Sequence, residues 1–343
     1  MPSVKNKLLK LLEKSGSLTR LADLTGFTEV NLPVWAAIRP NGKSGSCTVG
    51  KGLSKLQSKL SALFESYELT CAEKLRPYDL CNLNSNNNRF LFHPPSMYGD
   101  KVEFCIGKTI CTNFEVHIPF SCLSMDTTRK LDGYRCSTIG MGAGLTQDQA
   151  LKSAIREFIE RYSILKRARN SQFTLLKTDN IHEYACEPVL RRLVEYLTNI
   201  NYRILVQDLT EVDNWPCFNV RLLASADNGS MVGSGYGCSQ NWCKSLIQAI
   251  LEANQGMCVA ASGIRDDMYK SLYLINRSEK SRWRKETNSE YPEIEIDNLL
   301  AINQSKKPLY DEEKIINDLF VFEYPRLDSE DTFSCIKVLQ PVK

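Results

Sequence analysis

The sequence predicts an α/β protein with mixed sheets, in which three similar helices line one cleft. The first observation behind this prediction is an alternation of strand-like and helix-like stretches along the chain. A helical pattern at 187–198 precedes the strand-like RILVQDLT at 203–210, and FNVRLLAS at 218–225 has the pattern of a neighbouring strand. The second observation is a motif that occurs three times, each time with a glycine-rich segment before a helix. We therefore expect one fold that does not divide into independent domains.

The composition is that of an ordinary globular protein. The 343 residues can bury a substantial core, and 43% of them are hydrophobic while 24% are charged. The net charge of +3 is too small to indicate a nucleic acid or a membrane surface as partner. No stretch approaches the ~20 apolar residues of a membrane span. Residues 1–16 have an amphipathic helical pattern with charges inside the apolar run, which predicts an N-terminal helical extension and not a signal peptide.

Cysteine and histidine usage excludes several classes of site. The thirteen cysteines include no CxxC pair and no zinc-ligand spacing. We expect reduced, mostly buried thiols in a cytoplasmic protein. The three histidines, His93, His117 and His182, lie far apart in the sequence, which argues against a histidine-based hydrolase or a histidine-rich metal site.

The threefold motif consists of a Gly-x-Gly segment, a hydroxyl residue and a helical stretch with acidic residues. In each copy a Ser stands seven residues before a Glu, and the first two copies add a Glu four residues after that Ser. The third copy is one residue shorter between its glycines and its Ser, and it has Ala249 in place of the added Glu. The copies are Gly50-Lys51-Gly52, Ser54, Ser61, Glu65 and Glu68; Gly142-Ala143-Gly144, Thr146, Ser153, Glu157, Glu160 and Arg161; and Gly235-Tyr236-Gly237, Ser239, Ser245, Glu252 and Gln255.

The first residues of each copy predict where its helix begins. Glycine permits positive φ and close approach of another backbone, as a turn that cradles phosphate requires. Ser54, Thr146 and Ser239 are the expected N-caps of the three helices. Apolar runs between the polar positions predict helices that are buried on most sides.

The acidic residues of the motif predict a magnesium site. Residues three apart lie on one face of a helix, so Glu65 and Glu68 share a stripe, as do Glu157 and Glu160. A single pair of this kind is usually a solvated helix face, whereas three co-linear copies indicate function. Neighbouring carboxylates on a partly buried helix need a cation, and oxygen ligands suit Mg²⁺ bound to substrate phosphates. We therefore expect three converging helices whose Glu side chains hold Mg²⁺ beside a nucleotide.

These motifs resemble those of the YcaO family, and the likeness runs from about residue 17 to the end of the chain. The first two copies match the family's SxxxExxE(R) motifs, and the third matches Sx₆ExxQ. Residues 262–267, SGIRDD, resemble a stretch typical of family members that work with a TfuA partner. The opening strand region of the family is resembled by residues 19–26, 32–34 and 39–40, and its closing strand by FSCIKVLQPV at 333–342.

The resemblance implies a YcaO-type fold over residues 17–343, after the extension at 1–16, and an activity that uses ATP and Mg²⁺. Family members phosphorylate a peptide's backbone amide oxygen, so that a nucleophile can displace the phosphate and give a thioamide, an azoline or an amidine. The implied partners are a peptide or protein substrate, a TfuA-like protein and a second copy of the chain in a homodimer. By the family's motifs, Mg²⁺ is assigned to Glu65, Glu68, Glu157, Glu160 and Glu252, and the nucleotide to Lys51, Ser61, Ser153, Arg161, Ser245 and Gln255.

Departures from the family's pattern keep two alternatives open. Met257 and Gln248 stand where relatives commonly have Arg, and Ile139 and Leu145 replace Asn-like positions. One alternative is a scaffold that binds a partner or a peptide without turnover. The other is an accessory factor in the modification of a ribosomal protein. The C-terminus lacks the PxPxP tail of azoline-forming members, which favours thioamide formation or an unknown reaction.

Overall fold

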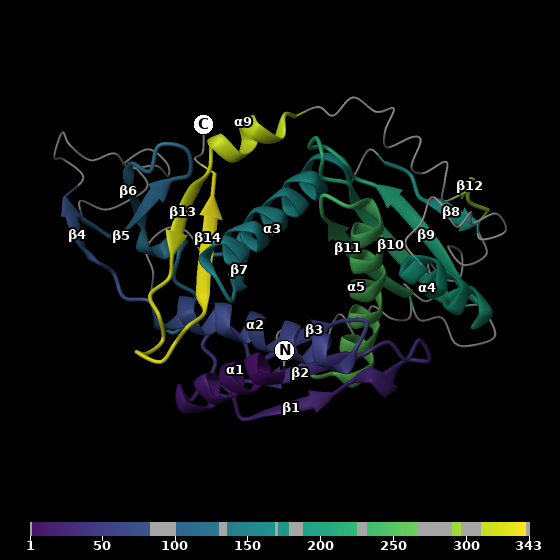
Figure 1. Cartoon of the computed structure of the whole chain (residues 1–343), viewed down its shortest axis with the longest axis horizontal. Coiled ribbons are helices and arrows are strands. Elements are labelled where there is room, and N and C mark those ends of the chain that lie inside the picture. The colour runs from purple at the N-terminus through teal and green to yellow at the C-terminus, as the bar shows by residue number, and fades with distance from the viewer. Residues whose placement is uncertain are drawn as a thin grey trace.

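The computed structural model describes residues 2–82, 101–129, 136–168, 171–177, 188–224, 232–265, 290–295 and 310–340. These residues form three β-sheets with helices packed on them (Figure 1). The architecture confirms the predicted α/β class. Among the helices of these ranges, none is long and apolar enough to cross a membrane.

The first sheet has three antiparallel strands in the order β1-β2-β3, and α2 packs on its face. The N-terminal helix α1 packs on α2 and buries Leu8, Leu11 and Leu12, as its amphipathic pattern predicts. The division of the chain at residue 17 stays a prediction. The elements are α1 (Pro2–Lys14), β1 (Arg20–Asp23), the 3₁₀ helix η1 (Thr25–Phe27), β2 (Val34–Ile38), β3 (Cys47–Lys51) and α2 (Lys55–Lys74).

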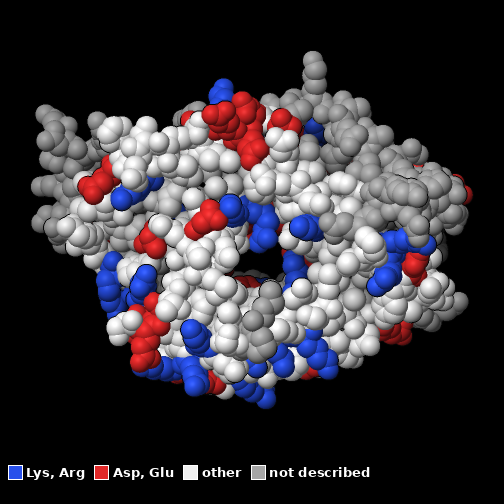
Figure 2. Space-filling view, in the orientation of Figure 1, with Lys and Arg blue, Asp and Glu red and all other residues white. Residues whose placement is uncertain are grey.

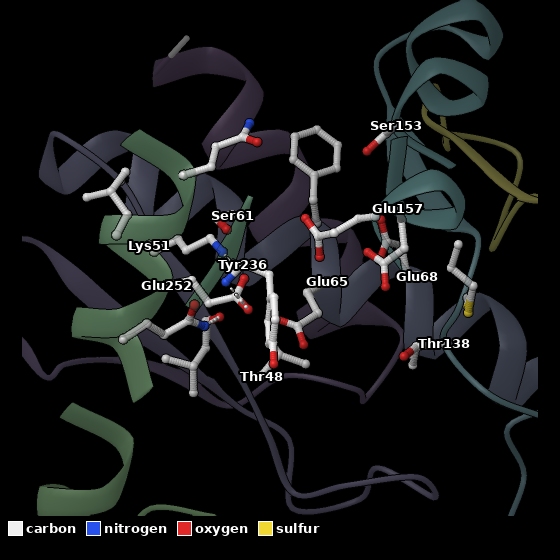
Figure 3. A pocket seen from close by; sticks show the side chains of 18 of the residues that line it. Thr48, Lys51, Ser61, Glu65, Glu68, Thr138, Ser153, Glu157, Tyr236 and Glu252 are labelled. Carbon is white, nitrogen blue, oxygen red and sulfur yellow. Dashed lines mark hydrogen bonds and ion pairs between the residues drawn. The ribbon is translucent and has the colours of Figure 1, made fainter. Parts of the chain in front are cut away.

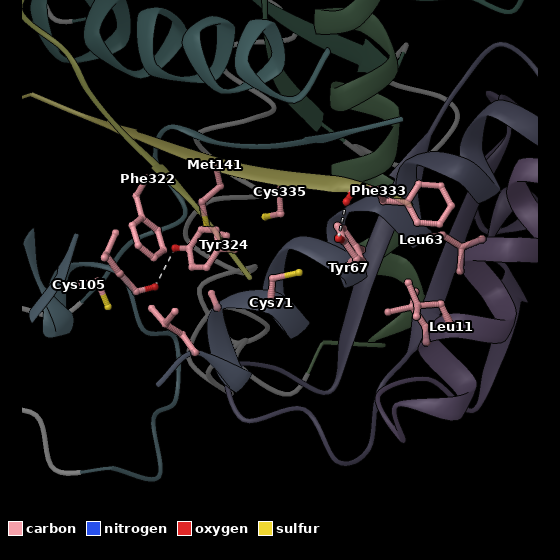
Figure 4. Close-up of a cluster of buried hydrophobic side chains, with 14 of the residues drawn as sticks. Leu11, Leu63, Tyr67, Cys71, Cys105, Met141, Phe322, Tyr324, Phe333 and Cys335 are labelled. Carbon is pink, nitrogen blue, oxygen red and sulfur yellow. Dashed lines mark hydrogen bonds between the residues drawn. The ribbon is translucent and has the colours of Figure 1, made fainter. Parts of the chain in front are cut away.

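The second sheet has six strands in the order β4-β5-β13-β14-β7, and β6 also pairs with β5. A core of apolar side chains and cysteines lies between this sheet and α2 (Figure 4). In this core the Tyr67 hydroxyl lies 3.2 Å from the Phe333 carbonyl oxygen, to which it donates a hydrogen bond. The elements are β4 (Asp79–Asn82), β5 (Lys101–Thr109), β6 (Glu115–Pro119), the 3₁₀ helix η3 (Phe120–Cys122), β7 (Met141–Gly144), α3 (Gln147–Arg167), α9 (Glu312–Asn317), β13 (Phe320–Glu323) and β14 (Ser334–Leu339).

The third sheet has five strands in the order β11-β10-β9-β8-β12, and it is mixed because β12 pairs with β8 in parallel. The two strands expected at 203–210 and 218–225 are β9 and β10, which pair antiparallel, and the helix expected before them is α4. Helices α4 and α5 bury their apolar faces on this sheet. The elements are β8 (Thr174–Lys177), α4 (Pro188–Asn199), β9 (Tyr202–Asp208), β10 (Cys217–Ala224), β11 (Val232–Cys238), α5 (Trp242–Ser262) and β12 (Glu293–Glu295).

Three strand–helix units form a ring at the centre of the molecule (Figure 1). β3 leads into α2, β7 into α3 and β11 into α5, and each of these strands is an edge strand of its sheet. Each helix packs on its own strand and also on the strand of the next unit, so that α2 contacts β7, α3 contacts β11 and α5 contacts β3. The ring therefore brings the three copies of the sequence motif together.

The motif glycines lie in or beside these edge strands and not in turns. A Cβ atom at Gly142 would lie 2.3 Å from the backbone nitrogen of Ala154 in α3, and Gly50 and Gly237 make equally close approaches to α2 and α5. Within the described ranges, none of the motif glycines has a positive φ. The predicted phosphate-cradling turn is therefore wrong. Glycine is needed here because the helix backbone lies directly on the strand.

Candidate active site

A cavity of about 1270 Å³ lies within the ring of α2, α3 and α5. Figure 2 shows the molecule hollowed at its centre, with Lys and Arg side chains around the opening. Each helix lines the cavity with the same five positions: a central residue, the residues one and four before it, and the residues three and four after it. On α2 these are Ser61, Phe64, Glu65, Glu68 and Leu69; on α3, Ser153, Arg156, Glu157, Glu160 and Arg161; and on α5, Gln248, Leu251, Glu252, Gln255 and Gly256.

The structure corrects the alignment of the third copy. Glu65, Glu157 and Glu252 each stand eleven residues after the N-cap of their helix, so Glu252 corresponds to the first Glu of the other copies and Gln255 to the second. The alignment based on the Ser residues was wrong by three positions. A shift of three residues keeps nearly the same helix face, so the sequence pattern could not distinguish the two alignments.

The N-caps of the three helices explain why the third copy was misaligned. Ser54 and Thr146 are N-caps as predicted, and each side chain accepts a hydrogen bond from a backbone N–H in the first turn. The expected third cap, Ser239, is wrong, because α5 begins two residues later and its N-cap is Asn241. Asn241 accepts a 3.0 Å hydrogen bond from the Lys244 N–H.

Ser245 is the one predicted site residue that does not line the cavity. It is fully buried in the first turn of α5, and its hydroxyl donates a 2.8 Å hydrogen bond to the Pro216 carbonyl. Gln248 takes the cavity position that Ser61 and Ser153 have on the other helices. The position of Ser245 therefore does not support its predicted contact with the nucleotide. All other predicted site residues line the cavity, and their ligands stay predictions.

The edge strands hold the carboxylates through backbone hydrogen bonds. Glu252 accepts a 3.3 Å hydrogen bond from the Tyr236 N–H of its own strand β11, and Glu65 accepts one from the Val49 N–H of its own strand β3. Glu68 instead accepts from the Ala143 N–H of β7, the strand of the next unit. Since an edge strand has backbone groups that its sheet leaves free, these N–H donors orient carboxylates toward the cavity.

Two cations of the cavity pair with acidic residues. Lys51 on β3 forms an ion pair with Glu252 on α5, which links the first unit to the third (Figure 3). Arg161 lies with its Nε atom 3.6 Å from a carboxylate oxygen of Glu157, one helical turn away. Both cations therefore stand where they can also meet the charge of a bound phosphate.

Burial raises the pKa of most of these carboxylates. Loss of hydration, followed by the negative charges of Glu157 and Glu65, raises the pKa of Glu68 to about 8. Burial also raises the pKa of Glu160 to about 7, and that of Glu157 lies above its ordinary value for the same reason. Glu65 is reached by water inside the cavity, but the protein around it removes it from bulk solvent, and its pKa rises to about 7. Like charges are held together here without enough cations to neutralise them.

Glu252 behaves in the opposite way. Burial acts to raise its pKa, but the positive charge of Lys51, the hydrogen bond from Lys51 and the hydrogen bond from the Tyr236 N–H outweigh burial and lower it. Glu252 is therefore the carboxylate of the site that stays ionised most readily.

The donor set fits a magnesium ion that is shared with a ligand. The cavity offers carboxylate oxygens from three helices, and the raised pKa values of those on α2 and α3 indicate that a bound cation would stabilise their ionised forms. Within the described ranges, no three His, Cys, Asp or Glu side chains are close enough together to hold a metal ion by themselves. Mg²⁺ usually takes one or two carboxylates and completes its shell with water and phosphate oxygens. The geometry thus suits Mg²⁺ bound together with a nucleotide.

Arg156 and Tyr236 are among the cavity residues that were not predicted from the sequence. Arg156 lines the cavity beside Ser153, and Tyr236 lines it next to Glu252. Arg156 has a signal in the sequence, because it stands three residues after Ser153 and so shares its helix face. Tyr236 has none, because its role comes from a backbone N–H at a sheet edge.

Comparison with a family model agrees with this geometry. Residues 49–315 match the model of the family described as YcaO cyclodehydratase, ATP- and Mg²⁺-binding. This interval contains α2, α3 and α5, the helices that carry the motif residues of the cavity.

Individual relatives are distant in sequence but similar in fold. An uncharacterized protein in the tfuA 3′ region of Rhizobium leguminosarum bv. trifolii is 24% identical over 282 residues, or 75% of this chain. The chain spans 65% of that relative's length. YcaO from Methanopyrus kandleri, bound with AMPPCP and Mg²⁺, is 17% identical with a TM-score of 0.67, covering 99% of this chain and 90% of that one. A chain of the E. coli microcin synthetase McbBCD complex is 14% identical with a TM-score of 0.63, covering 94% and 87%.

Proposed function

The chain belongs to the YcaO family of ATP- and Mg²⁺-binding cyclodehydratases, and we propose that it phosphorylates a backbone amide of a peptide. The observation that carries this proposal is the ring of three helices, which directs the five predicted metal-binding carboxylates into one cavity. The cavity exceeds the ~300–1,000 Å³ of an ordinary small-molecule site, which supports two occupants, a nucleotide and a peptide segment.

The cavity residues divide into groups with different tasks. Glu65, Glu68, Glu157, Glu160 and Glu252 would hold Mg²⁺, which neutralises the charge that develops on a transferred phosphoryl group. Lys51 and Arg161 would bind phosphate oxygens, and Ser61, Ser153 and Gln255 would donate hydrogen bonds to the nucleotide. These assignments are proposals, and they follow from position on the cavity wall.

The reaction follows from the chemistry of the amide. An amide oxygen is a poor leaving group, whereas phosphate is a good one. Phosphoryl transfer breaks the bond between the terminal phosphorus of ATP and the ADP oxygen, and it forms a bond between that phosphorus and the amide oxygen of the peptide. A nucleophile then adds to the carbon of that amide, and phosphate leaves with the original amide oxygen. The apolar side chains Phe64 and Leu69 on the cavity wall would limit hydrolysis by water.

We assign thioamide formation as the subtype, with a TfuA-like protein as partner. The relative from Rhizobium is named for its place beside tfuA, which supports this assignment. The TfuA-associated stretch begins at Ser262, the last residue of α5; Gly263-Ile264-Arg265 follow the helix, and Arg265 lines the cavity. Asp266 and Asp267 lie outside the described residues. A ribosomal protein as substrate and a homodimer as the active form are further proposals.

The departures from the family's pattern favour an enzyme over a scaffold. Met257 is buried in the core beneath the five-stranded sheet and does not line the cavity. Ile139 and Leu145 do not line it either. Gln248 does, but the five acidic residues are all retained. Most of the departures therefore lie away from the proposed chemistry.

An isotope experiment tests the proposed reaction. The purified chain is incubated with Mg·ATP, a sulfide source, a TfuA-like protein and candidate peptides encoded beside its gene, each with a heavy oxygen isotope at the backbone carbonyls. The proposal predicts that the label appears in the released phosphate and that the peptide gains the mass of a sulfur-for-oxygen exchange. Phosphate release without label in a modified peptide would contradict direct phosphorylation of the amide.

A further inference from the structure

Arg156 is a cation on the cavity wall of α3 that bonds to a hydroxyl group and not to a carboxylate. Its guanidinium donates a 3.2 Å hydrogen bond to the Ser153 hydroxyl. Among the described residues, no carboxylate lies within ion-pair distance of it. It stands directly before Glu157 on α3, and it lines the same cavity as Glu157 and Glu68. Arg161, by contrast, contacts Glu157 directly.

The position of Arg156 in the ring is also distinctive. The corresponding positions on the other two helices are Phe64 on α2 and Leu251 on α5, and both line the cavity as apolar residues. At this helix position, α2 and α5 therefore present apolar side chains to the cavity, and α3 presents a cation. A half-buried Arg on one wall, beside carboxylates that fit Mg²⁺, is the arrangement in which an anion contacts the metal and the guanidinium together.

We infer that Arg156, held by Ser153, binds the terminal phosphate of the nucleotide and stabilises that phosphoryl group during transfer. This inference rests on the proposed function. The guanidinium has five N–H donors and uses one on Ser153, so donors remain for two phosphate oxygens. During transfer, the bond from the terminal phosphorus to the ADP oxygen breaks and a bond to the amide oxygen forms. Charge on the equatorial oxygens is then met by a fixed cation.

The test compares two nucleotides that differ in the terminal phosphate. Binding of ADP and of AMPPCP, each with Mg²⁺, is measured by calorimetry for the native chain, Arg156→Gln, Arg156→Lys and Lys152→Gln. Lys152→Gln is the matched control, because it removes one positive charge from the same helix at an exposed position, where Lys152 pairs with Asp148. The thermal midpoint of each variant shows that it is folded.

We expect Arg156→Gln to weaken AMPPCP binding about 10- to 100-fold and ADP binding less than about threefold, as for loss of a charge-assisted hydrogen bond. Arg156→Lys should recover part of the loss, and Lys152→Gln should change neither. Equal weakening for both nucleotides would overturn the inference. So would unchanged AMPPCP binding with a raised KM for peptide, which would assign Arg156 to a carboxylate of the substrate. If the native chain binds neither nucleotide, the proposed function itself fails.

Discussion

Lys51 and Glu252 form an ion pair that joins the edge strand of the first unit to the helix of the third. Their side chains are 23% and 27% exposed, so the pair contributes no more than about 1 kcal/mol to stability. The ring is instead closed by packing and by hydrogen bonds such as the one that the Gln255 side-chain amide donates to the Val49 carbonyl oxygen. Lys51 is therefore free to serve a ligand without a large cost in stability.

This relationship predicts the effect of Lys51→Met. The free energy of unfolding should change by less than about 1 kcal/mol, while the affinity for Mg·ATP falls about tenfold because a cation facing the phosphates is lost. Chemical denaturation and calorimetry measure the two quantities. Lys55→Met, which removes an exposed charge near the start of α2, should alter neither. Affinity equal to that of the native chain would show that Lys51 does not face the nucleotide.

The close contact between strand and helix predicts that Gly142→Ala is destabilising. The added Cβ would lie 2.3 Å from the Ala154 nitrogen, so α3 would have to move off β7. We expect a loss of about 1–3 kcal/mol, as for overpacking, measured by urea denaturation. Gly26→Ala is the control, because a Cβ there meets nothing within 4 Å. A native-like stability of Gly142→Ala would contradict the close contact between β7 and α3.

The raised carboxylate pKa values predict how stability depends on pH when Mg²⁺ is absent. Glu68 has a pKa of about 8 and Glu160 of about 7, whereas an unfolded Glu has about 4.3. Between these values the folded chain binds more protons than the unfolded chain, so stability is full below the unfolded pKa and is lost as pH rises through the folded one. The thermal midpoint without Mg²⁺ should therefore fall between about pH 6 and 8.

A variant separates this effect from other titrations. Glu68→Gln cannot ionise, so its thermal midpoint should fall less over the same range and should exceed that of the native chain at pH 8. Glu195→Gln, at an exposed position on α4, should follow the native chain. A native midpoint that rises toward pH 8, or a Glu68→Gln curve parallel to the native one, would contradict the account.

A buried ion pair beside the cavity gives the fourth prediction. Arg39 has a fully buried side chain and contacts Glu73 at 2.7 Å, and Glu73 also accepts hydrogen bonds from the backbone N–H groups of Lys43 and Ser44. Arg39→Met should cost about 3–5 kcal/mol, because it leaves a buried carboxylate without its cation. It should also weaken ligand binding, since Ser44 lines the cavity.

The exposed pair of Arg191 and Glu195 is the control for this prediction. These residues lie four apart on α4 with 36% and 46% of their side chains exposed. Arg191→Met should cost less than about 0.5 kcal/mol in the same denaturation experiment. A similar small loss for Arg39→Met would show that Glu73 is stabilised without its cation.

The helix positions of the site could be predicted from the sequence, because helical periodicity is local. Glu65 with Glu68 and Glu157 with Glu160 share faces by spacing alone, and Ser54 and Thr146 cap their helices as their residue types indicate. The third copy was misaligned because the N-cap of α5 is Asn241 and not Ser239, which stands nearer to the motif glycines. Both are good capping residues, so the choice depends on packing against β11.

What could not be predicted depends on contacts between segments far apart in the chain. The order of the ring, in which Glu68 reaches Ala143 and Gln255 reaches Val49, follows from how three separate sheets are placed. The role of the glycines could not be predicted either, because a turn with positive φ and close packing on a helix both require glycine.

The central claim is that one Mg²⁺–nucleotide site is shared by all three helices. Calorimetry of Mg·ATP binding to the native chain and to Glu65→Gln, Glu157→Gln and Glu252→Gln tests it most directly, because one equivalent carboxylate is removed from each helix. The account predicts Mg²⁺-dependent binding by the native chain and a loss of at least about tenfold in every variant. Native affinity in any one of the folded variants, or no binding by the folded native chain, would contradict it.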